Sequence, residues 1–466
     1  MRSPLTRRDL LGQATLVAAA STLSPTVLRA LNGLMPSADS RPYLDAALRA
    51  ERWIARSAIK DGGRITWPAN PGDPKSVQQN LYSGSAGVLL FYLELHRATG
   101  DARYLQVARG AADHLIATLP TYGAALGDEG AGLYTGVAGI AYALRLTFEA
   151  THTVAYSDAV DRIGRLLADA MRANRPSASW NESTDIISGT SGILLTLLWL
   201  EERDPSWREW REDERRVVAA LIDAGVAEHG GLKWSINGAM PRRYPNFSHG
   251  TAGVGYTLAT FAQHDREHAA PALDAARSGA TYLDAITTHM PAGGRKIFHS
   301  EPGGEQLYYL SWCHGPAGTA RFYRQLAMAT RDARWNAYIP QLVQGITESG
   351  APEQHPDRSG YWNNISQCCG NCGIAEFFTA LYVAGRDPSH LALATRVMDN
   401  TLSRATTDGD GLKWVQAENR VSPLDVVAQT GLMQGAAGVG LALLHLDGAL
   451  QRRKPFVVLP DMPSWG

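Results

Sequence analysis

Three cysteines have the clearest potential for chemistry in this chain: Cys313, Cys368 and Cys369. Cys313 lies two residues before a Gly-x-x-Gly motif, and Cys368 lies two residues before the next such motif. Cysteine thiolates bind zinc, and a site with three protein ligands keeps a fourth position open for catalysis. The same cysteines could instead form a disulfide or pack as small apolar residues. Spacing alone supports a metal site and a disulfide about equally.

Histidines occupy the position directly before two of these motifs. His249 precedes Gly250, and His314 precedes Gly315. The earlier motifs carry Ser or Thr there, which are ordinary helix N-caps. His249 could be a buried core histidine or a helix cap, but a histidine here would also suit proton transfer near neutral pH. For His314 we favour a structural role, as a helix cap or a hydrogen-bond donor.

The motif that positions these residues occurs seven times. Its first glycines are separated by 52 to 65 residues, and a fixed period of this length is typical of repeat architectures. The copies begin at Gly84, Gly136, Gly189, Gly250, Gly315, Gly370 and Gly435. Each copy starts a run that is apolar on all sides, as in residues 193–200, which indicates a buried helix.

A second, amphipathic helix is predicted between successive copies. Examples are residues 43–57, 158–172, 214–228 and 272–287. Seven hairpins of one inner and one outer helix, each packed on its neighbours, predict an all-α fold of the α/α toroid type. The Gly231-Leu-Lys-Trp segment recurs from Gly411, and we expect it to form short extended pieces in the connecting loops. Inner helices that start at one end of the toroid would bring the cysteines and His249 to one mouth.

The N-terminus resembles an export signal. Thr6-Arg7-Arg8-Asp9-Leu10-Leu11, followed by a small and apolar stretch, is similar to a twin-arginine signal. We therefore predict a signal segment at residues 1–30, a single toroid domain at residues 31–466, and a periplasmic or extracellular location. If the signal is not used, the protein would stay in the cytoplasm.

Composition excludes several classes of protein. The 44 Lys and Arg residues balance 45 Asp and Glu residues, which argues against nucleic acid as the main partner. No run of 18 uncharged apolar residues occurs, so we expect no membrane span. Four cysteines in 466 residues do not make a disulfide scaffold. We expect a monomer.

Together, the seven hairpin motifs and three local sequences resemble the lanthionine synthetase C-like (lanthipeptide cyclase) family over residues 43–446. The three sequences are Ser248-His249-Gly250, Trp312-Cys313-His314-Gly315 and Cys368-Cys369-Gly370. The resemblance implies an α/α toroid with a central zinc ion. It also implies an activity in which a peptide cysteine adds to dehydroalanine or dehydrobutyrine and forms a thioether ring.

The resemblance also assigns roles to individual residues. It implies that Cys313 and Cys368 are zinc ligands, and that Cys369 is a third ligand, as in a Cys-Cys-Gly subgroup of the family. Three thiolates should make a bound thiolate more nucleophilic. The resemblance further implies that His249 is the acid/base residue and that Asp185 supports it.

The chain departs from the family pattern at two positions. Tyr309 stands where members often have arginine, and His314 stands where an aromatic residue commonly follows the first zinc cysteine. These departures leave open an exported binding protein on the same fold, with zinc structural or absent. A carbohydrate-active toroid is a third alternative. It would need two carboxylates across the cleft, and the adjacent pair Asp128 and Glu129 fits that need poorly.

Overall fold

The computed structural model describes residues 40–465, apart from residues 120–125, 127–129, 174–179, 181, 241, 354–359 and 419. Tyr43–Gly466 form one compact unit. The signal segment predicted at residues 1–30 lies outside the described residues. The boundary between this segment and a single domain at residues 31–466 stays a prediction.

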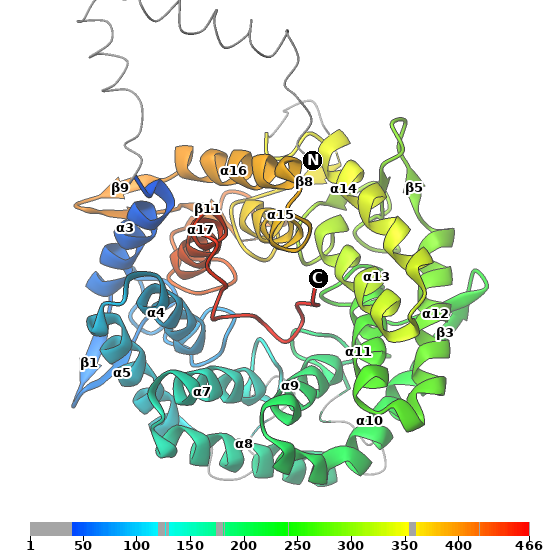
Figure 1. Ribbon diagram of the computed structural model, residues 1–466, viewed down its shortest axis with the longest axis horizontal. Coiled ribbons are helices and arrows are strands. Elements are labelled where there is room, and N and C mark those ends of the chain that lie inside the picture. Colours follow the sequence, from blue (N-terminus) through cyan, green and yellow to red (C-terminus); the bar gives the residue numbers. More distant parts are fainter. Residues whose placement is uncertain are drawn as a thin grey trace, which may run out of the picture. The chain divides into compact units, whose positions relative to one another are not determined.

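Two concentric rings of helices make up the unit, as Figure 1 shows. Among the described residues, the inner ring contains α4 (Ser85–Thr99), α7 (Val137–Thr151), α9 (Thr190–Arg203), α11 (Thr251–His264), α13 (Pro316–Thr330), α15 (Asn371–Gly385) and α17 (Ala436–Leu450). The outer ring contains α3 (Pro42–Arg56), α5 (Ala102–Thr118), α8 (Val154–Ala173), α10 (Arg211–Asp223), α12 (Ala269–Ala285), α14 (Tyr338–Glu348) and α16 (Pro388–Ser403). Since α17 packs against α4, the ring closes, and the predicted α/α toroid of seven hairpins is confirmed.

Burial follows the amino-acid pattern of the two rings. In α9 every residue from Thr190 to Glu201 is buried, as expected for a helix that is apolar on all sides. In the outer helix α14 only Leu342, Gly345 and Ile346 are buried, so one face packs inward and the other meets solvent. Among the described residues, the 3-10 helices η2 (Pro205–Trp210), η3 (Arg266–His268) and η4 (Ala333–Ala337) precede outer helices.

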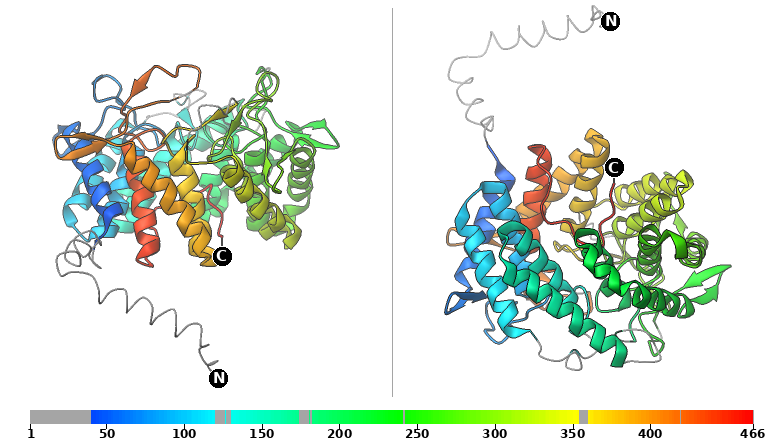
Figure 2. Two further views of the ribbon diagram at one scale, coloured as in Figure 1. Left: turned by 90° about the horizontal axis from the view of Figure 1, so that it is seen from above. Right: turned by 60° about the horizontal axis from the view of Figure 1, so that its bottom comes forward.

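Short strand pairs connect outer helices to inner ones. The antiparallel pairs are β1 (Ile59–Asp61) with β2 (Arg64–Thr66), β3 (Val226–Glu228) with β4 (Gly231–Lys233), β5 (Thr288–His289) with β6 (Arg295–Lys296), β9 (Thr406–Asp408) with β10 (Gly411–Lys413), and β11 (Gln416–Ala417) with β12 (Val426–Val427). β7 (Tyr308–Tyr309) pairs in parallel with β8 (Tyr361–Trp362). In Figure 2 these hairpins lie on one face of the ring.

The extended Gly-Leu-Lys segments predicted from the sequence are confirmed as β4 and β10. The predicted helix over residues 214–228 is wrong at its end. The helix α10 stops at Asp223, and residues 226–228 instead form β3, whose residues pair in register with β4. The ladder with β4 overrides the helical pattern of this short segment.

The second glycine of each Gly-x-x-Gly is required by a close backbone approach. A Cβ added at Gly318 would overlap the carbonyl oxygen of Trp312, and the other six copies have the corresponding conflict. Glycine is the residue that removes this conflict, because it has no Cβ. The motif therefore lets the chain turn back tightly over the first turn of each inner helix.

Candidate functional site

A closed ring of backbone hydrogen bonds joins the seven repeats just before the inner helices. Each N–H donates to a carbonyl oxygen of a neighbouring repeat, with N···O distances of 2.8–3.1 Å. The chain of bonds runs through Tyr82, Tyr134, Ile187 and Ile186, Ser248, Cys313, Cys368 and Met433, and returns to Tyr82. Cys313 and Cys368 are adjacent members of this ring, because the N–H of Cys313 donates to the carbonyl of Cys368.

The third repeat departs from this register by one residue. Ile187 accepts the bond from Tyr134, whereas Ile186 donates the bond to Ser248. Asp185 lies directly before this offset, and its side chain is fully buried. The offset places the Asp185 carboxylate beside the fourth repeat, which carries His249.

The three cysteines predicted as ligands lie together on this ring. The Cys369 sulfur is 3.3 Å from that of Cys313 and 3.5 Å from that of Cys368. All three sulfurs lie within 4.8 Å of one another, and the cysteines are free rather than disulfide-bonded. Cys313 and Cys368 are buried, while Cys369 is half-buried. The fourth cysteine, Cys372, is fully buried outside this cluster, as a packed small residue would be.

Mutual hydrogen bonding sets the ionisation of the cluster. The Cys313 thiol donates to Cys369, and the Cys369 thiol donates to Cys368. Hydrogen bonding with these two thiols holds the pKa of Cys368 well below the usual range, and the Tyr82 hydroxyl and the charge of His249 act in the same direction. Burial raises the pKa of Cys313 well above its usual value. One thiolate forms readily, and further ionisation in this buried position requires a cation.

This donor set fits zinc. Zinc prefers thiolate and imidazole ligands, and the sulfur separations approach the roughly 3.8 Å expected for a tetrahedral site with Zn–S bonds of about 2.3 Å. Cys313, Cys368 and Cys369 would hold the metal, and three protein ligands would leave one position for substrate.

Asp185 fixes one ring nitrogen of His249. The His249 Nδ1 lies 2.5 Å from Asp185 Oδ2, and Asp185 Oδ1 accepts bonds from the N–H and hydroxyl of Ser188. Burial alone would lower the pKa of His249, but the hydrogen bond and charge of Asp185, with a smaller effect of Cys368, raise it. The His249 side chain is 26% exposed, so Nε2 is the nitrogen left for a substrate.

Further aromatic and histidine side chains surround His249. The His314 ring stacks on His249 with centroids 5.6 Å apart, and His299 lies 4.4 Å from His314. Tyr244 packs against all three histidines, and Tyr309 lies 4.5 Å from His299. The N-cap position of α13 is Gly315 rather than His314, and the His314 ring packs inside this cluster.

Sequence reasoning missed His299, Tyr244 and the hydroxyl of Tyr82 as neighbours of the site. His299 and Tyr244 occupy loops outside the repeated motif, and no spacing rule connects them to the cysteines. Burial, followed by the positive charges of Arg420 and Arg242, lowers the pKa of His299 to about 4. Asp128 and Glu129, the carboxylates considered for glycoside hydrolysis, lie outside the described residues.

Comparison with known proteins identifies the family. Residues 75–459 match the model of the family described as lanthionine synthetase C-like protein, and the chain belongs to that family. A solved structure of nisin cyclase has a similar fold, with a TM-score of 0.59 and 16% identity, over 86% of this chain and 97% of that chain.

An inactive variant of an α-1,6-mannanase from Salegentibacter sp. HEL1_6 also matches. Its TM-score is 0.46 at 10% identity, over 88% of this chain and 99% of that one. No curated protein matches the sequence. Among the described helices, none has the length and apolar character needed to cross a membrane.

Proposed function

We propose that this chain is an exported, zinc-dependent enzyme that adds a cysteine thiol of a peptide to a dehydroamino acid and so forms a thioether. The observation that carries the proposal is that two sets of side chains lie at the same end of the ring, where the inner helices begin. These are the cluster of Cys313, Cys368 and Cys369 and the pair of His249 with Asp185. Membership of the family and the similarity to nisin cyclase support a cyclase-type role.

The reaction needs a thiolate and a proton donor. When bound by the three cysteines, zinc would favour the ionised form of a substrate thiol, whose ordinary pKa of about 8.5 leaves it mostly protonated at neutral pH. The sulfur forms a bond to the β-carbon of the dehydroamino acid, the carbon–carbon π bond breaks, and its electron pair moves to the α-carbon. One proton leaves the thiol and one proton must reach the α-carbon.

His249 supplies that proton in the proposed reaction. Asp185 holds Nδ1, which fixes the orientation of the ring and leaves Nε2 to donate. Because the pKa of His249 is raised, its imidazole stays protonated up to a higher pH than a free histidine would, as a general acid requires. The buried surroundings of Tyr309 and His314 limit the access of water from their side of the site.

The loops around the cluster suit a peptide substrate. The loop between β11 and β12 exposes Val421 and Leu424, which are 82% and 92% accessible. Arg420 in the same loop lies close enough to His299 to lower the pKa of that histidine. A peptide that reaches His249 would therefore pass near the cationic side chain of Arg420, and we propose that it also contacts the exposed apolar side chains of this loop.

A synthetic peptide with one dehydroalanine and one cysteine tests the activity. Cyclisation leaves the mass unchanged, so free thiol is counted after alkylation with iodoacetamide. We expect zinc-loaded wild-type protein to remove the alkylatable thiol and metal-free protein to leave it. Zinc-loaded protein that leaves the peptide unreacted, and also leaves a small thiol unreacted with the same alkene, would support a binding protein instead.

Export is tested separately by replacing Arg7 and Arg8 with Lys. We expect the variant to accumulate in the cytoplasm, because a twin-arginine signal depends on the arginine pair. Fractionation of the cells measures the outcome. Unchanged export would show that this pair does not direct the protein.

A further inference from the structure

The chain after the last inner helix enters the centre of the ring. This segment, Arg453–Trp465, belongs to no repeat, and Figure 1 shows it crossing the opening of the toroid. Its start is fixed by Glu94 of α4, whose fully buried carboxylate accepts bonds from Arg453 and from the N–H groups of Phe456 and Val457. Further along, Arg324 of α13 donates to the carbonyl of Ser464.

Asp461 lies deepest in this segment. Its side chain is fully buried, and its Oδ2 accepts three hydrogen bonds. The donors are Trp312 Nε1 at 2.7 Å, the Tyr134 hydroxyl at 3.2 Å and Arg321 Nη1 at 3.2 Å. The charge of Arg321 offsets the burial of this carboxylate, which would otherwise be strongly unfavourable.

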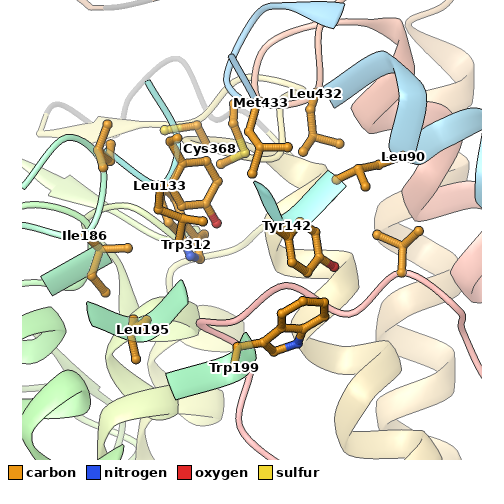
Figure 3. Close-up of a cluster of buried hydrophobic side chains, with 14 of the residues drawn as sticks. Leu90, Leu133, Tyr142, Ile186, Leu195, Trp199, Trp312, Cys368, Leu432 and Met433 are labelled. Atoms are coloured by element: carbon orange, nitrogen blue, oxygen red, sulfur yellow. The ribbon is translucent and has the colours of Figure 1, made fainter. Parts of the chain in front are cut away.

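Trp312 connects Asp461 to the cysteine cluster. It directly precedes Cys313, and its indole packs on Tyr134 and Phe247, with centroids 5.1 and 6.1 Å away. Trp312 and Cys368 both belong to the buried cluster of side chains drawn in Figure 3. Whatever fixes the indole therefore also fixes the backbone that carries the first cysteine.

The indole has space to move if this hydrogen bond is lost. A cavity of about 200 Å³ lies beside it, lined by Trp312, Tyr134, residues of α15 and α17, and the C-terminal segment. Close packing normally holds a core side chain in one rotamer, and a cavity weakens that restraint. The bond from Trp312 to the Asp461 carboxylate replaces packing on this side.

We propose that Asp461 is a positioning residue for the three-cysteine cluster. Through Trp312 it holds Cys313 within reach of Cys369, so the C-terminal segment supports the candidate metal site from inside the ring. The inference rests on the proposed function for its effect on catalysis. Its effect on metal affinity can be measured without any substrate.

A double-mutant cycle on zinc affinity tests this inference. The full-length variants are Asp461→Ala, Trp312→Phe and the double variant, titrated with zinc against a chelator. We expect each single variant to bind zinc about 10–100-fold more weakly, as is typical when a residue supporting a ligand is lost. The double variant should be no weaker than the weaker single one, since both changes remove the same bond.

Trp465→Ala is the matched control. Trp465 is in the same segment but packs on Phe377 of α15, so its loss should leave zinc affinity unchanged. If Asp461→Ala does not fold, Asp461→Asn replaces it in the cycle, because the amide oxygen still accepts a bond. We then expect a loss smaller than for Trp312→Phe.

Three results would overturn the inference. They are wild-type zinc affinity in folded Asp461→Ala, losses for Asp461 and Trp312 that multiply in the double variant, and an equal loss in the Trp465→Ala control. Wild-type protein that binds no zinc would overturn both this inference and the proposed function. Wild-type protein that binds zinc but forms no thioether would overturn only the proposed function.

Discussion

His445 should make the free energy of unfolding depend strongly on pH. Its side chain is 11% exposed inside the ring, with Nδ1 2.9 Å from both carboxylate oxygens of Glu376 and Nε2 3.8 Å from Glu94. Burial alone would lower the pKa of His445. The charges and hydrogen bonds of Glu376 and Glu94 outweigh burial and raise this pKa to about 10.

The size of the effect follows from the difference between the folded and unfolded pKa values. An unfolded histidine has a pKa of about 6.5, so the folded state binds the proton more tightly by about 3.5 pKa units, or roughly 5 kcal/mol. The full contribution is present below about pH 6.5 and is lost as the pH rises through about 10. Of this, about 4 kcal/mol remains at pH 7 and less than about 1 kcal/mol at pH 10.

Urea unfolding of wild-type protein and of His445→Gln between pH 6 and pH 10 measures this contribution. The difference in free energy of unfolding should shrink by several kcal/mol over that range, because titrating groups that do not interact with His445 cancel in the difference. His289→Gln, at an exposed position in β5, is the control and should give a constant difference. Wild-type and His445→Gln curves that stay parallel would refute the assignment of a charged His445 between two carboxylates.

Three further predictions concern the site and the ring. The His249→Ala variant should keep its zinc, but its rate of thioether formation should fall about 10²–10⁴-fold, and Asp185→Asn should be less affected. Equal rates for wild type and His249→Ala would exclude His249 as the acid. Gly318→Ala should lower the free energy of unfolding, measured in urea, by about 1–3 kcal/mol, because the added Cβ would overlap a carbonyl oxygen. Gly385→Ala should change this free energy little, because open space surrounds Gly385. Leu424→Ser should raise KM for the peptide about three- to tenfold at unchanged kcat if this exposed side chain contacts substrate, and an unchanged KM would place the peptide elsewhere.

The sequence was sufficient to predict the toroid because its determinants are local and repeated. Each second glycine, such as Gly318, removes a backbone conflict within its own repeat, so the motif records the turn directly. The meeting of Cys313 and Cys368 followed from their equivalent positions in adjacent repeats. The backbone ring that joins them at 3.1 Å could not be predicted, because it depends on how seven repeats close.

Residues outside the repeats were the ones that sequence analysis missed. His299 and Tyr244 reach the site from loops, and Asp461 reaches it from the C-terminal segment. Their positions depend on tertiary contacts far apart in sequence, which no period in the chain encodes. The end of α10 was missed for a similar reason, because pairing with β4 decides the conformation of residues 226–228.

The central claim is that Cys313, Cys368 and Cys369 together hold one zinc ion. X-ray absorption at the zinc edge of the purified protein tests it most directly, with Cys369→Ala as the comparison. We predict one zinc per chain with three sulfur neighbours at about 2.3 Å, falling to two sulfurs or to loss of the metal in the variant. Purified protein without zinc, with a disulfide at Cys313, or with a sulfur count unchanged by Cys369→Ala would contradict the account.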